Sequence, residues 1–183
     1  MKKAYIFLAD GFEEVEGITV IDLLRRAEVE VSMVSVTEKL VVHGAHGIDI
    51  CANTLFEEQE FISNGMLILP GGMPGTTYLG AHEKLKILLD KWNNNQRWIA
   101  AICAAPTIFG DYGYLQNKKA TCFPGMEHRL KGALISEEPV VRDGHIITSR
   151  GMGTAIPFAL TLIEILKGKE EAEKLRKAIV FQS

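Results

Sequence analysis

Two residues in this chain, a cysteine and a glutamate, have types and surroundings that suit covalent chemistry. Cys103 lies in the stretch Arg97–Thr107, where a short apolar run precedes Pro106, a residue suited to the first turn of a helix. The pattern predicts a strand-to-helix corner at Cys103, with Ala101 and Ala105 as the small residues that such a corner needs. Because a helix N-terminus favours negative charge, we expect a lowered pKa for the thiol. The alternative is a cysteine that serves only as a small core side chain.

The glutamate is Glu16, which lies on the apolar face of a helix predicted over residues 14–27. Burial of an unpaired carboxylate is costly and favours its protonated form, so an inward carboxyl group needs a partner. Glu13 and Glu14 are explained more simply as acidic residues in the first turn of a helix. The residues that share the face of Glu16 are Val20, Leu23, Leu24 and Ala27.

A glycine-rich loop and a pair of histidines are further candidates. The loop Pro70–Gly75 follows an apolar strand, and its backbone N–H groups suit a developing oxyanion. It lacks the Lys-Ser/Thr ending of a phosphate loop, and a tight strand-to-helix turn is the alternative interpretation. His43 and His46 are three residues apart, but no third ligand of suitable spacing is near them. We therefore expect neither a metal nor another cofactor.

The elements that must position these residues alternate along the chain. This order predicts an α/β fold, a mostly parallel sheet with helices on both faces, whose sites collect at the carboxyl ends of the strands. The loops 10–16, 71–75 and 103–105 follow three such ends. We expect strands at 5–9, 29–36, 66–69, before 103 and from 119, helices at 14–27, 56–61, 82–95, 104–113, 126–131, 154–166 and 170–177, and hairpins at 40–51 and 140–147.

Composition narrows the classes of protein. A length of 183 residues, 47% of them hydrophobic, predicts a single domain over residues 1–183. A net charge of −3 without a basic cluster argues against nucleic acid as a partner. Three cysteines without a CxxC pair favour a reduced, cytoplasmic setting. The basic start Met1–Lys3 precedes an apolar run that stops at Asp10, so neither a signal peptide nor a membrane partner is expected.

Four stretches together resemble the ThiJ/PfpI superfamily, and within it the branch of the Parkinsonism-associated protein deglycase. The resemblance covers nearly the whole chain and implies a flavodoxin-like sandwich that forms a homodimer, with Cys51 near the dimer interface. It also implies a reactive Cys103 whose sulfur is hydrogen-bonded by a protonated Glu16. Oxyanion donors would be the backbone N–H groups of Gly72 and Ala104. The stretches are Ala9–Glu16, Leu69–Gly72, Ala100–Pro106 and Thr148–Thr154.

The same resemblance implies a rim around the site and reveals one departure. Gly71, Arg26 and His46 correspond to positions on this rim. Family members with glyoxalase or deglycase activity commonly carry a histidine where this chain has Phe123, so a ready general base is missing. His128, five residues further on, is the alternative base.

Two hypotheses from different classes remain. The first is a cofactor-independent enzyme that acts on a small aldehyde or dicarbonyl, as a glyoxalase or deglycase does, with Cys103 as nucleophile and Glu16 carrying protons. The second is a non-catalytic oxidative-stress sensor or chaperone in which Cys103 is oxidised to sulfenic and then sulfinic acid, and Phe123 slightly favours it. A protease is not expected, because Ala104 stands where the peptidase branch has histidine. His145 followed by Ile146 does not supply the histidine–glutamate pair of a glutamine amidotransferase.

Overall fold

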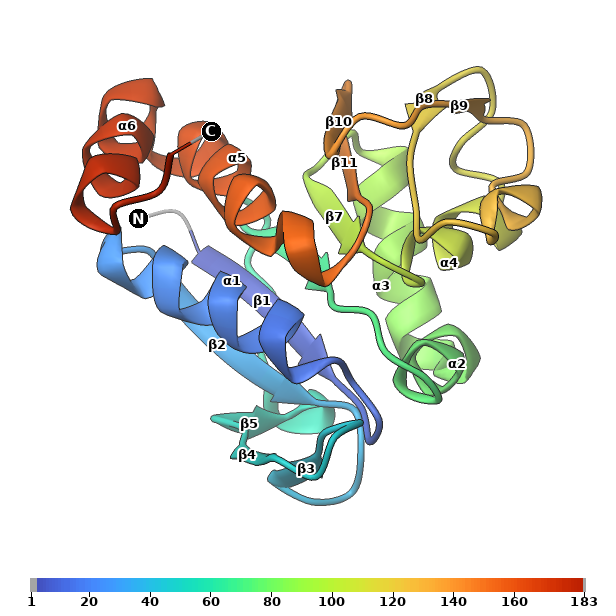
Figure 1. Ribbon diagram of the computed structural model, residues 1–183. Coiled ribbons are helices and arrows are strands. Elements are labelled where there is room, and N and C mark those ends of the chain that lie inside the picture. Colours follow the sequence, from blue (N-terminus) through green and yellow to red (C-terminus); the bar gives the residue numbers. More distant parts are fainter. Residues whose placement is uncertain (1–2, 183) are drawn as a thin grey trace.

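Seven strands form one sheet at the centre of the molecule (Figure 1). The structure, a computed structural model, describes residues 3–182; Met1 and Lys2 of the basic start, and Ser183, lie outside the described residues. In order across the sheet, the strands are β10 (Val140–Asp143), β11 (Ile146–Ser149), β7 (Ile99–Ile102), β6 (Met66–Leu69), β1 (Lys3–Leu8), β2 (Glu30–Ser35) and β5 (Thr54–Leu55). Neighbouring strands are parallel except for one pair at an edge of the sheet, β10 and β11, which is antiparallel.

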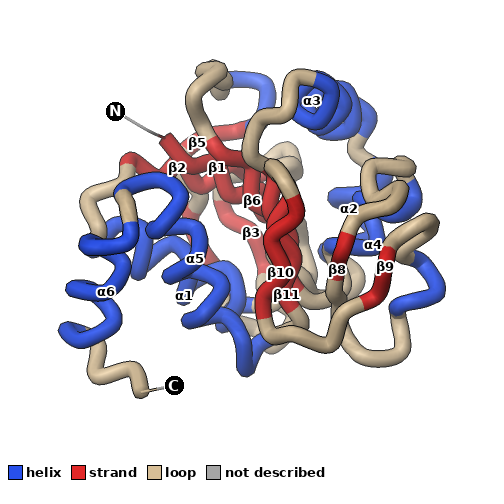
Figure 2. Tube along the Cα trace, turned by 90° about the horizontal axis from the view of Figure 1, so that it is seen from above, coloured by secondary structure: helices blue, strands red, loops and turns tan. Residues whose placement is uncertain are grey.

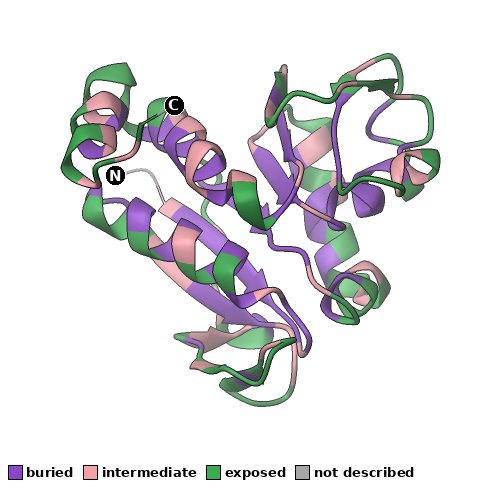
Figure 3. Cartoon of the chain, viewed as in Figure 1, coloured by how far each residue is buried: buried purple, intermediate pink, exposed green. Residues whose placement is uncertain are grey.

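The sheet is buried on both faces, as its continuous apolar strands require. In β1, Ile6 and Leu8 pack into one hydrophobic core. Tyr5 and Phe7, which alternate with them, pack into the other. Figure 2 shows helices on both sides of the sheet, and Figure 3 shows that their buried sides face it. The first core is covered by α1 (Glu14–Arg26), α5 (Ala155–Lys167) and α6 (Lys169–Ala178), and the second by α2 (Gly75–Ala81), α3 (Glu83–Asn94) and α4 (Pro106–Asp111).

Smaller elements decorate the ends of this sandwich. An antiparallel hairpin lies beyond β2 and β5, and a short parallel pair lies at the opposite end of the molecule (Figure 1). The hairpin consists of β3 (Val41–His43) and β4 (Asp49–Cys51), and the pair of β8 (Lys119–Ala120) and β9 (Leu134–Ile135). The 3-10 helices are η1 (Phe56–Glu58), η2 (Glu127–Arg129) and η3 (Met152–Thr154).

Most of the predicted elements are confirmed, and so is the α/β fold. Both hairpins form, and α5 ends at Gly168, whose positive φ of 100° suits glycine. Helix α2 was not predicted, because its sequence GTTYLGA has two glycines and no apolar periodicity. The predicted helices at 56–61 and 126–131 are only three-residue 3-10 helices. Among residues 3–182, none of the helices is both long and apolar enough to cross a membrane.

The topology brings four loops together at one edge of the sheet. Strands β11, β7, β6 and β1 are neighbours and parallel, so their carboxyl ends lie side by side. The chain leaves β1 for β2 on one side, whereas β6 lies on the other, and such a reversal of strand order opens a crevice for ligands. The loops that follow β6, β7 and β11 carry Gly72, Cys103 and Gly151, and the loop that follows β1 leads to Glu16 in the first turn of α1.

Candidate active site around Cys103 and Glu16

Cys103 occupies the predicted corner between β7 and α4. Its φ of +65° lies in the left-handed region, which a non-glycine residue adopts only where its surroundings hold it. Two backbone hydrogen bonds do so: the Cys103 N–H donates to the Ser149 carbonyl at 3.0 Å, and the Phe123 N–H donates to the Cys103 carbonyl at 2.8 Å. The thiol is partly exposed and forms no disulfide. The corner therefore presents the sulfur at the edge of the sheet.

The loop after β6 can approach Cys103 this closely only because it contains glycine. A Cβ atom on Gly71 would lie 2.6 Å from the Cβ of Cys103 and 2.6 Å from Oε2 of Glu16. Gly72 has a φ of +94°, and a Cβ there would lie 2.3 Å from the backbone nitrogen of Glu13. The Glu13 N–H in turn donates to the Gly71 carbonyl at 2.9 Å. The loop is thus held between the start of α1 and Cys103.

Glu16 is inward, as its place on the helical wheel predicted. Its side chain is only 1% exposed, and Oε2 accepts a hydrogen bond of 2.9 Å from the Gly71 N–H. Oε1 is buried as well, and the Cys103 thiol is a further hydrogen-bonding neighbour of the carboxyl group. Burial raises the pKa of Glu16 to about 7, and the charge of Glu13 adds to this, while the hydrogen bonds with Cys103 and Gly71 oppose it. The group can therefore gain and lose a proton near neutral pH.

The expected lowering of the thiol pKa is wrong for the resting site. Burial, followed by the charge and hydrogen bond of Glu16, raises the pKa of Cys103 to about 12. The backbone N–H groups of Ala104 and Gly72 act in the opposite direction, because they hydrogen-bond the sulfur. Helix α4 has only six residues, and its terminus does not outweigh burial beside a carboxyl group. Cys103 is thus a thiol at rest, with a proton acceptor and two N–H donors beside it.

One wall of the site is aromatic and another is open. A Cβ atom on Gly151 would lie 3.5 Å from Cδ2 of Phe123 and 4.0 Å from Sγ of Cys103. An atom at that position would thus be in van der Waals contact with both the sulfur and the ring of Phe123, a residue that is 49% exposed. Gly151 was not predicted as a site residue, although a glycine-bearing loop directly after a strand was a usable signal.

Comparison with known proteins decides the family. The model of the DJ-1/PfpI family matches residues 2–165. The chain belongs to the DJ-1/PfpI family. It is 38% identical to protein DJ-1 homolog B of Arabidopsis thaliana over 99% of this chain, yet it spans only 42% of that relative's length. It is 29% identical to a Schizosaccharomyces pombe protein named glutathione-independent glyoxalase DJ-1, over 98% of each chain. The structure of oxidized Toxoplasma gondii DJ-1 superposes with a TM-score of 0.93 at 33% identity and covers 99% of each chain.

In this DJ-1/PfpI chain, His46 lies next to the acidic start of α1. Its Nδ1 is 2.9 Å from Oε2 of Glu14, and its backbone N–H donates to Oε1 of Glu14 at 2.6 Å. Glu14 lies in the first turn of α1, as predicted, but it is buried and only 2% exposed. Although burial opposes it, the bonds from His46 and Ile48 lower the pKa of Glu14 to about 2, and the pKa of His46 is raised, first by Glu14. The pair ties the hairpin to the helix that carries Glu16.

The same pair changes the assessment of metal ligands. One ligand atom from each of Glu13, Glu14 and His46 lies within 4.8 Å of the others. These acidic residues are more than 30 positions from the histidine in sequence. The search for a third ligand close in sequence to His43 and His46 therefore did not find them. His43 bonds elsewhere, with Nδ1 2.8 Å from Asp49. Because His46 already pairs with Glu14, the three residues are explained as a structural contact, and we propose no metal there.

Two residues assigned to the rim lie on α1 and η2. Arg26 lies at the far end of α1 and binds Asp22 at 2.6 Å. Ten residues of helix separate it from Glu16, about 15 Å at 1.5 Å per residue. His128 is exposed on η2, and its role as the alternative base stays a prediction. Neither side chain has a place in the chemistry proposed below.

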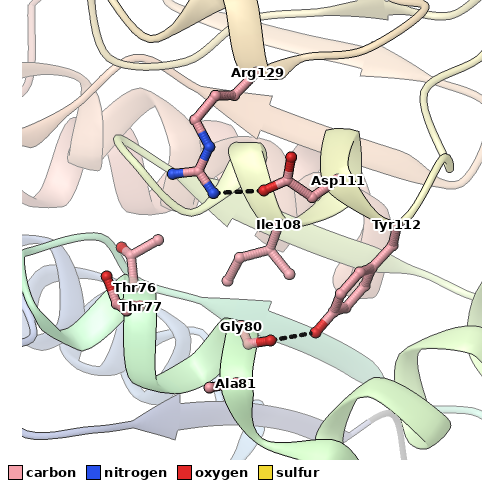
Figure 4. Close-up of a pocket in the computed structure, with 8 residues that line it drawn as sticks. All are labelled: Thr76, Thr77, Gly80, Ala81, Ile108, Asp111, Tyr112 and Arg129. Atoms are coloured by element: carbon pink, nitrogen blue, oxygen red, sulfur yellow. Dashed lines mark hydrogen bonds and ion pairs between the residues drawn. The ribbon is translucent and has the colours of Figure 1, made fainter.

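A separate pocket lies between α2, α4 and η2 (Figure 4). Arg129 and Asp111 form an ion pair on its wall, and the Tyr112 hydroxyl donates to the Gly80 carbonyl at 2.8 Å. These polar groups satisfy one another, and neither Cys103 nor Glu16 lines the pocket. This pocket is therefore separate from the site around Cys103 and Glu16.

Proposed function

We propose that this chain is a cysteine-dependent, cofactor-independent enzyme that converts small reactive dicarbonyls into hydroxy acids, with glyoxalase- or deglycase-like chemistry. The observation that carries the proposal is the contact between Cys103 and Glu16, a thiol beside a buried carboxyl group with a pKa of about 7. Such a pKa suits a group that must both accept and return protons at neutral pH. The Schizosaccharomyces pombe relative named a glyoxalase supports the same reaction class.

The reaction begins with proton transfer from the thiol to the carboxylate of Glu16. The sulfur then forms a bond to the aldehyde carbon, and the aldehyde oxygen gains the proton, which gives a hemithioacetal. The N–H groups of Gly72 and Ala104, which already hydrogen-bond the sulfur of Cys103, stabilise the negative oxygen during the attack.

The second half of the reaction moves hydrogen and adds water. Glu16 takes the proton from the former aldehyde carbon and returns it to the neighbouring carbonyl carbon, while the hydroxyl proton of the hemithioacetal passes to the neighbouring oxygen. These transfers convert the hemithioacetal into a thioester of a hydroxy acid. Water then cleaves the carbon–sulfur bond, which releases the hydroxy acid and restores the thiol. In the overall reaction one dicarbonyl and one water give one hydroxy acid, so neither an external oxidant nor a cofactor is needed.

Glu16 is the residue that we assign to every proton transfer. Its charge and its hydrogen bond are, after burial, the largest contributions to the raised pKa of Cys103. The histidines with assigned partners are engaged with other groups: His43 with Asp49, His46 with Glu14, His82 with the Leu85 N–H and His145 with Asn93.

The test is consumption of methylglyoxal and formation of lactate by the purified protein. Wild type should form lactate, and Cys103→Ser should form none, because the serine hydroxyl is a far weaker nucleophile at this pH. Cys51→Ser is the matched control, since Cys51 is an exposed free thiol on β4, and it should keep the wild-type rate. Equal lactate formation by Cys103→Ser and wild type would rule the proposal out.

A second candidate is a redox sensor or chaperone that uses the same cysteine. It is favoured by the partial exposure of Cys103 and by the similarity to the oxidized form of Toxoplasma gondii DJ-1. In this alternative the sulfur gains oxygen atoms from peroxide, and Glu16 and the neighbouring N–H groups hydrogen-bond them. Selective oxidation of Cys103 without any lactate formation would favour this role over the enzyme.

We further propose a homodimer and a cytoplasmic location, on the basis of the family resemblance and the free cysteines. The outer face of α1 supports the dimer, because Val15 and Ile18 on it are 45% and 40% exposed. Sedimentation equilibrium should give twice the chain mass for wild type and a weaker dimer for Ile18→Glu. A monomer at all concentrations would contradict the dimer.

A further inference from the structure

We propose that Phe123 makes this site selective for α-oxoaldehydes that carry an aromatic substituent. The inference rests on the proposed function, since it concerns the second substituent of the dicarbonyl whose aldehyde reacts with Cys103. It names a substrate class for the site and a role for the residue that replaces the family histidine.

The first observation is the rigid placement of Phe123 beside the nucleophile. Its N–H donates to the Cys103 carbonyl at 2.8 Å, so the two residues are joined through the backbone. The Met126 N–H donates to the Phe123 carbonyl at 3.1 Å, which fixes the turn on the other side. The aromatic residue is therefore anchored next to the reacting atom.

The second observation is the space that the ring faces. The Cβ position of Gly151, which is empty, lies 3.5 Å from the ring and 4.0 Å from the sulfur. A substrate atom bound to the sulfur and a group packed on the ring can thus belong to one small molecule. Because Phe123 is 49% exposed, half of the residue remains to be covered by a ligand.

The third observation is the apolar character of the neighbouring loop residues. Met73 directly follows Gly72 and is 54% exposed, and Met152 directly follows Gly151 and is 56% exposed. Both methionines are next in sequence to a glycine that lies beside Cys103, and exposed apolar side chains near a site favour an apolar ligand group. The methyl group of methylglyoxal covers little of this surface, whereas a phenyl ring can stack on Phe123 and contact a thioether.

The test compares phenylglyoxal with methylglyoxal in two assays. In the first, each compound protects Cys103 against iodoacetamide, and alkylation of the peptide that contains Cys103 is measured by mass spectrometry. In the second, the two hydroxy acids are quantified. The variants are Phe123→Ala and Phe123→Leu, with Ile87→Ala as control, because Ile87 is 66% exposed on α3.

We expect the preference for phenylglyoxal to fall about 2- to 12-fold in Phe123→Ala, the range that corresponds to an aromatic contact of roughly 0.5–1.5 kcal/mol. Phe123→Leu, which keeps an apolar side chain, should lose part of it, and Ile87→Ala none. An unchanged preference in both Phe123 variants would overturn the inference. If phenylglyoxal protects Cys103 better than methylglyoxal but no hydroxy acid forms, the proposed enzyme activity is refuted and the aromatic preference stands. If neither compound protects Cys103, both the enzyme activity and the aromatic preference are refuted.

Discussion

Replacement of Glu16 by glutamine should change how stability depends on pH. In the folded chain the pKa of Glu16 is raised from 4.5 to about 7, mainly by burial. The folded state therefore holds this proton more tightly than the unfolded state does. Its contribution to stability is complete below pH 4.5 and disappears as pH rises through 7.

The magnitude follows from the two pKa values. Linkage gives a loss of roughly 2–3 kcal/mol in the free energy of unfolding between pH 5 and pH 8 from this one group. For a chain of this size, that corresponds to a fall of roughly 5–10 °C in Tm. Glu16→Gln keeps the acceptor for the Gly71 N–H at nearly the same size but cannot ionise, so the variant should lack this loss.

The assay is urea denaturation of wild type and Glu16→Gln at pH 5, 6, 7 and 8. The difference in the free energy of unfolding between the two proteins isolates Glu16, since all other titrating groups are common to both. Glu164→Gln, which removes an exposed carboxyl group from α5, is the control. A wild-type-minus-Gln difference that is the same at every pH would refute a raised pKa for Glu16.

Three further expectations follow from the same site. The kcat/KM of wild type for methylglyoxal should rise with pH around a midpoint near 7, as Glu16 becomes the carboxylate that accepts the thiol proton, and a pH–rate profile of Glu16→Gln should lack that rise. Phe123→His, which restores the base found in related enzymes, should raise methylglyoxal turnover roughly 10- to 100-fold in a steady-state assay. Mild peroxide should oxidise Cys103 before Cys122, because Cys103 is partly exposed and Glu16 can accept its proton, whereas Cys122 is buried; peptide mass spectrometry would reveal the opposite order if it occurred.

The sheet and its main helices could be predicted because their signals are local. The apolar run of β1 and the 3.6-residue periodicity of α1 are patterns among residues that are close together in the sequence, so the sequence alone displays them. The inward direction of Glu16 followed from the same periodicity, since it shares a face with Val20 and Leu24, both buried in the structure. Helix α2 had no such periodicity, so it was missed.

Other properties of the site depend on contacts between distant segments. Glu14 is buried because His46, 32 residues away, covers and pairs with it, and helical periodicity contains no sign of that contact. The raised pKa of Cys103 reflects burial and the proximity of Glu16, whereas the sequence displayed only a helix start. Arg26 was assigned to the rim from family correspondence, yet the length of α1 carries it away from Cys103.

The division of labour between Cys103 and Glu16 is tested most directly by ¹³C NMR with labelled methylglyoxal. We expect wild type to form lactate and Cys103→Ser to form neither adduct nor lactate. Glu16→Gln, which cannot accept the thiol proton, should form the hemithioacetal far more slowly than wild type and should release no lactate. Lactate formation at the wild-type rate by either variant would contradict the roles assigned to these two residues.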